Sequence, residues 1–520
     1  TAPDQPIDLD GPNGAFEPFD PLTNPETPIL AVIGARAQAA PDRIAVQDDT
    51  RTQTYAELLA ESRALAAGIA ACVPSGQPVG IRLRDTVAGP VALLACLMAA
   101  TPAVLLDCTD PPERLIRLAT ASRLAAIITE TDLPDLRCIN PFGNPPVPCA
   151  ARPLAQDAPA FVVWTSGSSG RPKGIVHSQR SVLHRAGLLV NSAHLSAADR
   201  YLSLNTPSSM GALLNALAAF LSGATLHRVS MAQFGLGRVL RRMRDDRITA
   251  VIGVPALYRA LSRMAGASAA MSSLRLLSSN GEALLAADLA LLRTCLPADC
   301  HVQMVYGATE TQAGLRFVPR AETPDGAQVA AGRPVPGTQF AILRDDGTPA
   351  SNGEAGELMI RSRYTVIGEW EDGRCVEGRL RQDGDPASGW RRYAMGDMVR
   401  LRQDEAFIVV GRADRQLKLN GHRIEPVEVE AALRSEAAVM DATALPVAGQ
   451  AGPELVAFVA TGPAPPDDLR DRLSAVLMAR VPPYMRPRRL HLLACLPLLS
   501  GNKVDAHALR ALDASMSGHS

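Results

Sequence analysis

The residues from Phe161 to Gly174, FVVWTSGSSGRPKG, place hydroxyls, glycines and one lysine directly after a short apolar run. Glycine lets a backbone turn tightly and bring its N–H groups close to an anion. Hydroxyl groups and an ammonium group add further hydrogen-bond donors. The stretch therefore predicts a phosphate-binding loop built from Thr165, Ser166, Gly167, Ser168, Ser169, Gly170 and Lys173.

The spacing of this loop argues against one class of nucleotide-binding enzyme. Its order is Gly-x-x-Gly-x-x-Lys-Gly, which differs from the Gly-x4-Gly-Lys-Ser/Thr of P-loop NTPases. A Walker-type kinase or GTPase is therefore disfavoured. Considered alone, the loop has a second interpretation, because Ser/Gly-rich segments are commonly flexible linkers.

Further motifs contain oxygen ligands that suit a nucleotide. In VYGATET, residues 305–311, Thr309 offers a hydroxyl for a phosphate, and Glu310 offers a hard ligand for magnesium bound to a triphosphate. In RRYAMGDMVRL, Asp397 follows a glycine turn and can accept hydrogen bonds from two ribose hydroxyls. LLSGNKVDAHAL, around Lys503, comes last. Taken singly, each motif is more often a solvated turn or an edge strand than a site.

Alternating strands and helices must position these motifs. Apolar patterns predict helices over 55–70 and 87–100, and strands over 79–83, 103–106 and 125–129. Strands that alternate with helices are typical of parallel sheets covered by helices. We therefore expect an α/β fold with a large N-terminal domain of parallel-rich β-sheets layered with helices, and a small α+β C-terminal domain on a hinge.

The length of 520 residues also indicates more than one domain, because a single hydrophobic core stops growing well below this size. Residues 1–27 are acidic and rich in proline and glycine, which predicts a poorly ordered lead. We expect residues 28–412 to form the large domain that binds nucleotide and substrate. Residues 413–520 are expected to form the small mobile domain.

Composition points to small molecules as partners. With 52 basic and 53 acidic residues the net charge is −1, which gives no electrostatic footprint for nucleic acid or an anionic membrane. The nine cysteines are scattered, without the paired spacing of a zinc or redox motif. No signal peptide or run of 18 apolar residues is present. A cytoplasmic protein is expected, and His177, His184 and His194 are assigned to packing or surface positions rather than to a metal.

Taken in order, these motifs resemble those of the adenylate-forming superfamily, which comprises acyl-CoA synthetases, adenylation domains of nonribosomal peptide synthetases, and luciferases. The resemblance extends over more than 400 residues and includes QTYAEL, SNGEAL, GELMIRSRYTVIGEW and VPPYMRP. The phrases GEAL, SRYTVIGEW and QLKLNGHRIEPVEVEAAL are more similar to peptide-synthetase adenylation domains than to ordinary acyl-CoA synthetases.

The resemblance implies that the chain binds ATP and Mg²⁺. The loop from Thr165 to Lys173 would hold the β- and γ-phosphates, Thr309 would touch the α-phosphate, and Glu310 would ligate the magnesium ion. The nucleoside would be held by Tyr306 against the adenine ring, by the backbone of Gly281, Glu282 and Ala283, and by Asp397 and Arg412 at the ribose.

By the same resemblance, Lys503 is the catalytic candidate. Its ammonium would bridge the substrate carboxylate and the α-phosphate and stabilise the charge that builds as pyrophosphate leaves. In a second half-reaction the small domain would rotate about Asp414 and present residues 418–421, while a phosphopantetheine thiol attacks the acyl-adenylate. The chain ends 17 residues after Lys503. We therefore expect the carrier protein to come from another polypeptide or from another part of a longer one.

Two motifs depart from the superfamily pattern. Met395 stands where threonine usually precedes Gly-Asp, which removes one polar contact but leaves Asp397. The lysine loop reads Ser-Gly-Asn-Lys rather than Pro-Asn-Gly-Lys, so Asn502 occupies a position usually given to glycine. Asparagine tolerates a positive φ better than most residues, so the turn can survive. If it does not, Lys503 is misplaced and adenylation is slow.

A third departure concerns the acid. Adenylation domains for amino acids carry an aspartate for the α-ammonium, and the usual spacing of 13 residues before Gly223 leads to Met210. Burying an ammonium without a partner costs at least ~3 kcal/mol, a hundredfold in affinity. We expect instead a carboxylic acid with an apolar body and one polar group near Asn280 or Ser278. The pocket aligned in this way comprises Met210, Gly211, Leu214, Ser278, Asn280, Val305, Ala313 and Gly314.

Three functions are consistent with these motifs. The first is a ligase of the adenylation-domain type, which loads a carboxylic or unusual amino acid onto the phosphopantetheine of a carrier protein in peptide-synthetase-type secondary metabolism. The second is an acyl-CoA synthetase, which differs in using free coenzyme A as the acceptor. The third is a nucleotide-binding scaffold weakened in catalysis, which the order of Gly501 and Asn502 supports. Exchange of pyrophosphate into ATP would exclude the third.

Overall fold

The chain divides into two compact units. One comprises residues 1–108, 121–164 and 174–413, and the other residues 109–120, 165–173 and 414–520. The expected boundary between residues 412 and 413 stays a prediction. The structure, a computed structural model, describes residues 7–13, 16, 18–19, 28–142, 152, 154–165, 172–322, 329–351, 353–385, 388–412, 417–419, 422–424, 426–449, 452–462, 465–497 and 504–517.

The largest sheet belongs to the first unit and has nine strands. In sheet order these are β15 (Arg333–Pro334), β14 (Gln312–Phe317), β13 (His301–Gly307), β12 (Leu276–Asn280), β11 (Ala250–Gly253), β9 (Arg200–Ser203), β10 (Thr225–His227), β1 (Ile44–Gln47) and β2 (Thr52–Thr54). Every neighbouring pair from β13 across to β1 is parallel. The pairs at the two ends are antiparallel. This pairing confirms the parallel-rich sheet expected from the alternating pattern.

A second sheet has eight strands and also contains a run of parallel pairs. In sheet order these are β19 (Arg374–Val376), β18 (Gly368–Glu371), β8 (Lys173–Ser178), β7 (Pro159–Thr165), β4 (Ala103–Leu105), β3 (Val79–Arg82), β5 (Ala126–Thr129) and β6 (Cys138–Ile139). The pairs from β7 to β6 are parallel, whereas β18 runs antiparallel to β8 and β19. The three predicted strands at 79–83, 103–106 and 125–129 are β3, β4 and β5, each one residue shorter than expected.

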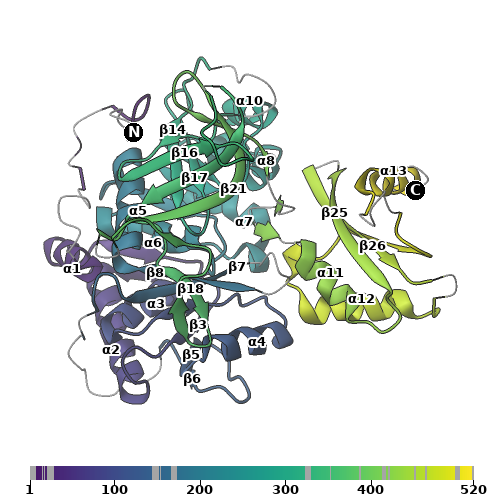
Figure 1. Cartoon of the computed structure of the whole chain (residues 1–520). Coiled ribbons are helices and arrows are strands. Elements are labelled where there is room, and N and C mark those ends of the chain that lie inside the picture. The colour runs from purple at the N-terminus through teal and green to yellow at the C-terminus, as the bar shows by residue number, and fades with distance from the viewer. Residues whose placement is uncertain are drawn as a thin grey trace. The chain divides into compact units, whose positions relative to one another are not determined.

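Helices connect the strands of these sheets, and the two N-terminal ones that the sequence predicts are α2 (Tyr55–Cys72) and α3 (Ala88–Ala99). A capping box starts α2, because Thr54 accepts a hydrogen bond from the N–H of Glu57 and the Glu57 carboxylate accepts one from the N–H of Thr54. Figure 1 shows α2 and α3 side by side. The other helices of the chain up to residue 300 are α1 (Ile29–Ala39), α4 (Pro112–Ser122), α5 (Gln179–Ala193), α6 (Met210–Ser222), α7 (Met231–Asp245), α8 (Pro255–Ser262), α9 (Ala267–Ala270) and α10 (Ala286–Cys295).

A third sheet in the first unit is antiparallel throughout. Its strands are β16 (Thr338–Leu343), β17 (Gly356–Ser362), β21 (Arg391–Leu401), β20 (Arg381–Gln382) and β22 (Phe407–Arg412), the last paired with β21. Asp397 lies inside β21, so the expectation of a turn before it is wrong. The reason is a bulge, where Gly396 has φ +69° and the register with β17 shifts. Glycine adopts this left-handed conformation without strain, and a bulge redirects the side chains next to it.

The second unit contains a small mixed sheet and its helices. The strands are β25 (Asp441–Gly449), β26 (Gly452–Ala460) and β27 (Arg489–Leu493), with a separate pair β23 (Leu417–Leu419) and β24 (His422–Ile424). Its C-terminal helices are α11 (Pro426–Arg434), α12 (Leu469–Arg480) and α13 (Ala506–Ser517). Leu433 of α11 and Leu473 of α12 share one apolar core with Ala457 of β26.

Described residues of the N-terminal lead pack against the C-terminal end of α5. Phe16 stacks on the ring of His194 at 4.5 Å, and Asp8 lies 2.9 Å from His194 Nε2. The backbone N–H of Phe19 donates to the side-chain oxygen of Asn191 at 2.8 Å, and the amide nitrogen of Asn191 donates back to the Phe19 carbonyl. These contacts cover the point where the helix ends and His194 adopts a left-handed conformation.

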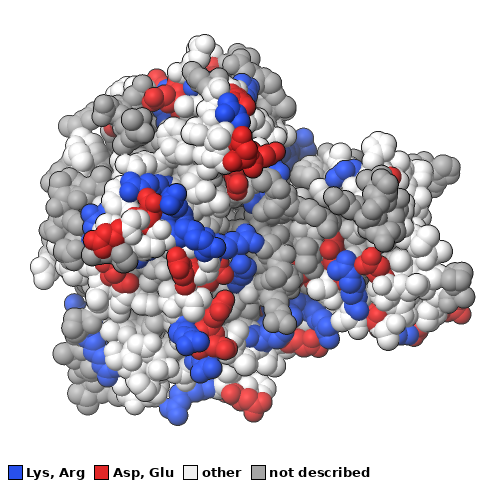
Figure 2. Space-filling view, viewed as in Figure 1, with Lys and Arg blue, Asp and Glu red and all other residues white. Residues whose placement is uncertain are grey.

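On the face that Figure 2 shows, basic and acidic side chains lie interspersed. All eight cysteines among the described residues are unpaired. Within the described ranges, no helix combines the length and apolar character that a membrane span needs.

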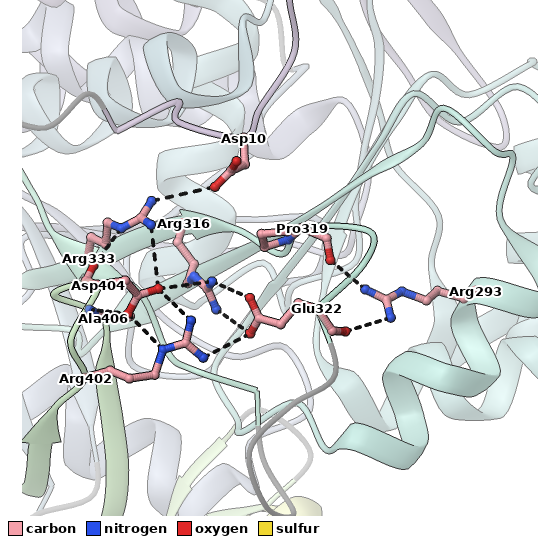
Figure 3. A network of polar contacts seen from close by, with 9 residues as sticks. All are labelled: Asp10, Arg293, Arg316, Pro319, Glu322, Arg333, Arg402, Asp404 and Ala406. Atoms are coloured by element: carbon pink, nitrogen blue, oxygen red, sulfur yellow. Dashed lines mark hydrogen bonds and ion pairs between the residues drawn. The ribbon is translucent and has the colours of Figure 1, made fainter.

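A buried ionic network joins the edge of the nine-stranded sheet to the loop between β21 and β22 (Figure 3). The guanidinium of Arg316, which is 1% exposed, donates to both carboxylate oxygens of Glu322 at 2.9 and 2.5 Å. Asp404 receives two hydrogen bonds from Arg402 and lies 3.7 Å from Arg316 and 3.6 Å from Arg333. The network therefore fixes β14 and β15 against the hairpin that carries Asp397.

Breaking this network is expected to lower stability strongly. Arg316→Met leaves Glu322 and Asp404 short of a buried counter-charge, which costs about 3–5 kcal/mol. Arg344→Met, which breaks the exposed pair of Arg344 with Glu354, is the matched control and should cost at most about 1 kcal/mol. Thermal unfolding of the three proteins at pH 7 measures the difference, and equal melting temperatures for the two variants would contradict it.

The difference in stability between Arg316→Met and the unsubstituted protein should depend on pH. Hydrogen bonds from Arg402 lower the pKa of Asp404 to about 2, against about 3.9 for an unfolded aspartate. Burial raises the pKa of Glu322, but Arg316 and Arg402 outweigh it and the net shift is downward. Because folded-state pKa values below the unfolded ones stabilise only the ionised forms, this contribution is complete at neutral pH and is lost as the pH falls from about 4 towards 2. The gap between Arg316→Met and the unsubstituted protein should narrow as Glu322 is protonated, because the lowered pKa of Glu322 depends most on Arg316. Asp404 keeps its hydrogen bonds from Arg402 in the variant.

Candidate active site

Several predicted site residues lie at one edge of the nine-stranded sheet. The parallel strands β9, β11, β12 and β13 end there, and ligands of open α/β sheets bind outside such ends. Asn280 is the last residue of β12, and Tyr306 is the next-to-last of β13. Asn280 pairs with Val305, so the loop that starts at Gly281 begins beside Tyr306. Gly281 has φ +78°, which lets this loop turn away from the strand.

A buried carboxylate forms the centre of the predicted nucleoside site. Asp397 is 3% exposed and accepts a hydrogen bond from the Tyr306 hydroxyl at 2.8 Å. The Arg412 guanidinium donates to its other oxygen at 2.5 Å and to the Met395 carbonyl at 3.4 Å. These side chains come from β13, β21 and β22, so two sheets meet at one carboxylate. The structure therefore brings together three residues separated by up to 106 positions, 306 to 412.

The electrostatics of this cluster leave Asp397 able to accept further hydrogen bonds. Burial, and then the neighbouring Asp397 carboxylate, raise the pKa of Tyr306 well above its ordinary value, so the hydroxyl remains a donor. The positive Arg412 compensates the charge of the buried carboxylate. An ionised carboxylate offers about four acceptor positions, and Tyr306 and Arg412 occupy two of them. A pair of vicinal hydroxyls matches the remaining acceptor positions.

In the loop beyond Gly281, Glu282 is partly exposed and Ala283 is exposed.

Thr309 and Glu310 lie in the tight connection between β13 and β14. The Ala308 N–H donates to the Thr311 carbonyl at 2.8 Å across this turn. The Glu310 carbonyl accepts from the N–H of Val366 at 3.1 Å, and Glu310 is 5% exposed. The turn is thus held on one side by the segment that leads into β18.

Arg185 of α5, which no sequence motif indicated, holds the same turn from the other side. Its guanidinium donates to the carbonyls of Thr309 at 2.7 Å and Ala308 at 3.0 Å. Burial lowers the pKa of Arg185 to about 10, and the Glu310 carboxylate opposes that shift. The guanidinium therefore stays charged at neutral pH. No short sequence signal indicates this role, because the burial of α5 becomes evident only in the structure, and arginine is rarely buried without a partner.

Part of the predicted site lies outside the described residues. The loop residues Ser166, Gly167, Ser168, Ser169 and Gly170, the hinge residue Asp414 and the catalytic candidate Lys503 all belong to this part. Both ends of the phosphate loop are described, since Thr165 ends β7 and Lys173 begins β8. The Thr165 hydroxyl donates to the Lys173 carbonyl at 3.4 Å, which joins the two ends.

One wall of the predicted acid pocket is the first turn of α6. Met210 and Leu214 are four residues apart on the same face, and both are buried, at 4% and 5% exposure. Gly211 lies against Asn205, because a Cβ atom there would come within 3.1 Å of the Asn205 amide. A Cβ atom at this position would require the Asn205 side chain to shift by a few tenths of an ångström.

The remaining pocket residues lie on β12, β13 and β14. The Ser278 hydroxyl is buried and donates to the side-chain oxygen of Gln303 at 2.8 Å, whereas Asn280 is partly exposed. Val305 is partly exposed beside Asn280. Ala313 is fully buried in the core beside Tyr306, and Gly314 is covered by the backbone of β15. Of the two polar candidates, Asn280 therefore has the more accessible polar group.

Two buried histidines have packing positions. His184 stacks on Tyr364 at 3.8 Å, and burial lowers its pKa to about 3. Burial also lowers the pKa of His177 well below its ordinary value. In the described part of the chain, no group of three or more His, Cys, Asp and Glu side chains could hold a metal ion by itself.

Comparison with protein families gives one match that covers most of the chain. The model described as "AMP-binding enzyme" matches residues 34–368. A linear gramicidin synthase of Brevibacillus parabrevis is 28% identical over 92% of this chain and 9% of its own length. AMB antimetabolite synthetase AmbB of Pseudomonas aeruginosa is 33% identical over 91% of this chain and 38% of its own length. The chain thus spans a minor part of both relatives.

Solved structures show the same fold. The o-succinylbenzoate CoA synthetase from Bacillus subtilis superposes with a TM-score of 0.79 and 22% identity, and covers 93% of this chain and 98% of its own. NpsA-ThdA, an artificially fused adenylation–carrier di-domain from Klebsiella oxytoca, has a TM-score of 0.77 and 21% identity over 89% and 93%. These similarities confirm the α/β class expected from the sequence.

Proposed function

Because this chain belongs to the AMP-binding enzyme family and is an adenylate-forming ligase, we propose that it activates a carboxylic acid with ATP and transfers the acyl group to the phosphopantetheine thiol of a carrier protein. The observation that carries this proposal is the cluster of Tyr306, Asp397 and Arg412. It joins two sheets around one buried carboxylate suited to a ribose. A Rossmann-type or P-loop site would use a different set of residues.

The residues at the site fit a magnesium ion shared with a nucleotide. Magnesium is commonly held by one or two carboxylates together with substrate phosphates. Glu310 supplies one buried carboxylate in a turn whose backbone is fixed by Arg185 and Val366. When bound, the ion would neutralise charge on the departing phosphates. Glu310 would hold it, and Thr309 would donate its hydroxyl to the α-phosphate.

The first half-reaction forms a mixed anhydride. An oxygen of the acid attacks the α-phosphorus of ATP, the bond from that phosphorus to the bridging oxygen breaks, and pyrophosphate leaves with the electron pair. Lys503 would neutralise the two anions as they approach, which is an electrostatic role that needs no proton transfer. In the second half-reaction the thiol sulfur attacks the acyl carbon, AMP leaves, and the thiol proton passes to solvent.

A carrier protein is the acceptor that we propose. The two relatives named above are synthetases considerably longer than the part aligned with this chain, and one structural neighbour is a fused adenylation–carrier di-domain. We therefore assign the thiol to a carrier protein in peptide-synthetase-type metabolism rather than to free coenzyme A. We also propose that residues 413–520 rotate about Asp414 between the two half-reactions.

Exchange of labelled pyrophosphate into ATP tests this function. We expect exchange that depends on one class of acid across a panel of aryl, aliphatic, hydroxy and amino acids. Product analysis with a holo carrier protein or with free coenzyme A then identifies the acceptor. A thioester formed at least as fast with coenzyme A would replace the carrier assignment by an acyl-CoA synthetase. The absence of exchange with every acid, while ATP still binds, would refute the ligase function.

A further inference from the structure

A line of polar side chains runs from the interior of the first unit to the carboxyl end of β12. The hydroxyl of Tyr201, 2% exposed, meets the side-chain oxygen of Asn215 at 3.2 Å. Asn215, fully buried on α6, donates through its amide nitrogen to the Ser203 hydroxyl at 3.1 Å and to the side-chain oxygen of Asn205 at 3.0 Å. Asn205 in turn donates to the side-chain oxygen of Asn280 at 3.3 Å. We name these residues the amide relay.

The relay has a direction. Burial, with a smaller effect of the Asp199 carboxylate, raises the pKa of Tyr201 far above its ordinary value, so its hydroxyl keeps the proton. Within the described part of the chain, the side-chain oxygen of Asn215 is the sole hydrogen-bond acceptor for that proton. Asn215 must then turn its two N–H bonds towards Ser203 and Asn205. Every later amide accepts through oxygen and donates through nitrogen.

As a consequence, the orientation of the Asn280 side-chain amide is fixed. Its oxygen is occupied by Asn205, and none of the hydrogen bonds among the described residues engages its amide nitrogen. Asn280 is partly exposed at the edge where β12 and β13 end. Gly211 leaves room for this arrangement, because a Cβ atom there would lie 3.1 Å from the Asn205 amide and would require it to shift by a few tenths of an ångström. The amide relay therefore ends, on a partly exposed side chain, in N–H groups that no hydrogen bond of the described residues engages.

We propose that the amide relay selects the substrate, so that Asn280 donates a hydrogen bond to an acceptor on the acid. The substrate class is then a carboxylic acid with an apolar body and a second oxygen, or an unprotonated nitrogen, at the position that meets Asn280. This proposal rests on the proposed function, because it places Asn280 in the acid pocket. It excludes an ammonium group at that position, since N–H groups cannot solvate a cation. The buried Met210 offers no carboxylate instead.

Discrimination between matched acids tests the proposal. Sets of three acids share one carbon skeleton and carry a methylene, an oxo group or an ammonium group at carbon 2, 3 or 4. At one carbon the oxo acid should exceed both relatives in kcat/KM by about ten- to a hundredfold, because a donor that the bound acid covers and leaves without an acceptor loses that much. Binding measured calorimetrically with a non-hydrolysable ATP analogue should give the same ranking without turnover.

Three variants separate selection from folding. Asn280→Asp replaces the donor by a carboxylate and should reverse the ranking in favour of the ammonium acid. Tyr201→Phe removes the group that sets the direction and should lower the preference for the oxo acid by about two- to tenfold, with the KM for ATP unchanged. Asn140→Asp makes the same chemical change at an exposed position and should keep the ranking.

The possible outcomes are distinct. A ranking that follows the oxo group, and that reverses in Asn280→Asp, supports the amide relay as the selector. The proposal is overturned if the unsubstituted protein prefers the ammonium acid. It is also overturned if Asn280→Asp lowers kcat/KM for all acids by the same factor. If no acid supports exchange but the binding ranking holds, the ligase function fails while the assignment of Asn280 stands.

Discussion

Replacing Lys503 with alanine is expected to lower acid-dependent pyrophosphate exchange by about 10²- to 10³-fold, the loss typical of removing one group that stabilises transition-state charge. Binding of ATP should change little, because the ribose and magnesium contacts are assigned to other residues. The measurement is the exchange rate at saturating acid, together with the ATP dissociation constant from calorimetry. A rate within about tenfold of the unsubstituted protein would show that Lys503 is not the catalytic group.

Lysine usage in the chain sharpens this experiment. The sequence contains three lysines among its 52 basic residues, and they are Lys173, Lys418 and Lys503, each in a motif assigned to the reaction. A chain that uses arginine almost everywhere keeps the compact, mobile ammonium at these positions. Lys503→Arg is therefore expected to fail to restore exchange. An amine-reactive label should report on these three side chains and the α-amino group, and ATP should protect Lys173.

Replacing Arg185 with alanine is expected to lower kcat by about 10²-fold through the position of the Thr309–Glu310 turn, because its guanidinium donates to backbone carbonyls of that turn. Its guanidinium holds the carbonyls of Ala308 and Thr309 and lies near the Glu310 carboxylate. Without it, two partly buried carbonyls lose their donors and the turn can shift. A displacement of ~1 Å at reacting groups costs about this much. The KM for the acid should stay nearly constant, while the magnesium concentration for half-maximal rate should rise.

Controls distinguish positioning from loss of folding. Arg185→Lys keeps the charge but cannot donate to both carbonyls in a fixed fork, so it should recover only part of the rate. Arg241→Ala removes an exposed arginine on α7 and should leave kcat unchanged. Circular dichroism and thermal unfolding confirm that each variant is folded. Equal losses for alanine and lysine, with no change in the magnesium response, would contradict the positioning role.

The fold could be predicted because its signals are local. Apolar runs separated by helix-length patterns identified β3, β4, β5, α2 and α3 to within about two residues. The turn expected before Asp397 was wrong for a non-local reason. Gly396 has the positive φ of a turn, but pairing with β17 and β22 keeps it inside one long strand. A glycine signals that conformation without telling whether a turn or a bulge results.

The candidate site likewise contains residues that the sequence predicted and residues that it did not. The motifs predicted Tyr306, Asp397 and Arg412, which the structure brings together at one carboxylate. Arg185 and Asn205 escaped because their partners lie 124 and 75 positions away, and no short pattern encodes such a contact. From the sequence alone, Ser278 and Asn280 were equally good candidates for the polar group of the acid pocket. The partner of Ser278, Gln303, becomes evident only when β12 and β13 are paired.

The contacts of the lead with α5 bear on where the chain can be cut or exchanged between proteins. A module excised from residue 28 onwards would lose Phe16 from the ring of His194 and the backbone partners of Asn191. Both contacts lie at the end of the helix that carries Arg185. A boundary chosen from the first helix alone would therefore loosen the support of the Thr309–Glu310 turn, so an excised or swapped module should begin before residue 7.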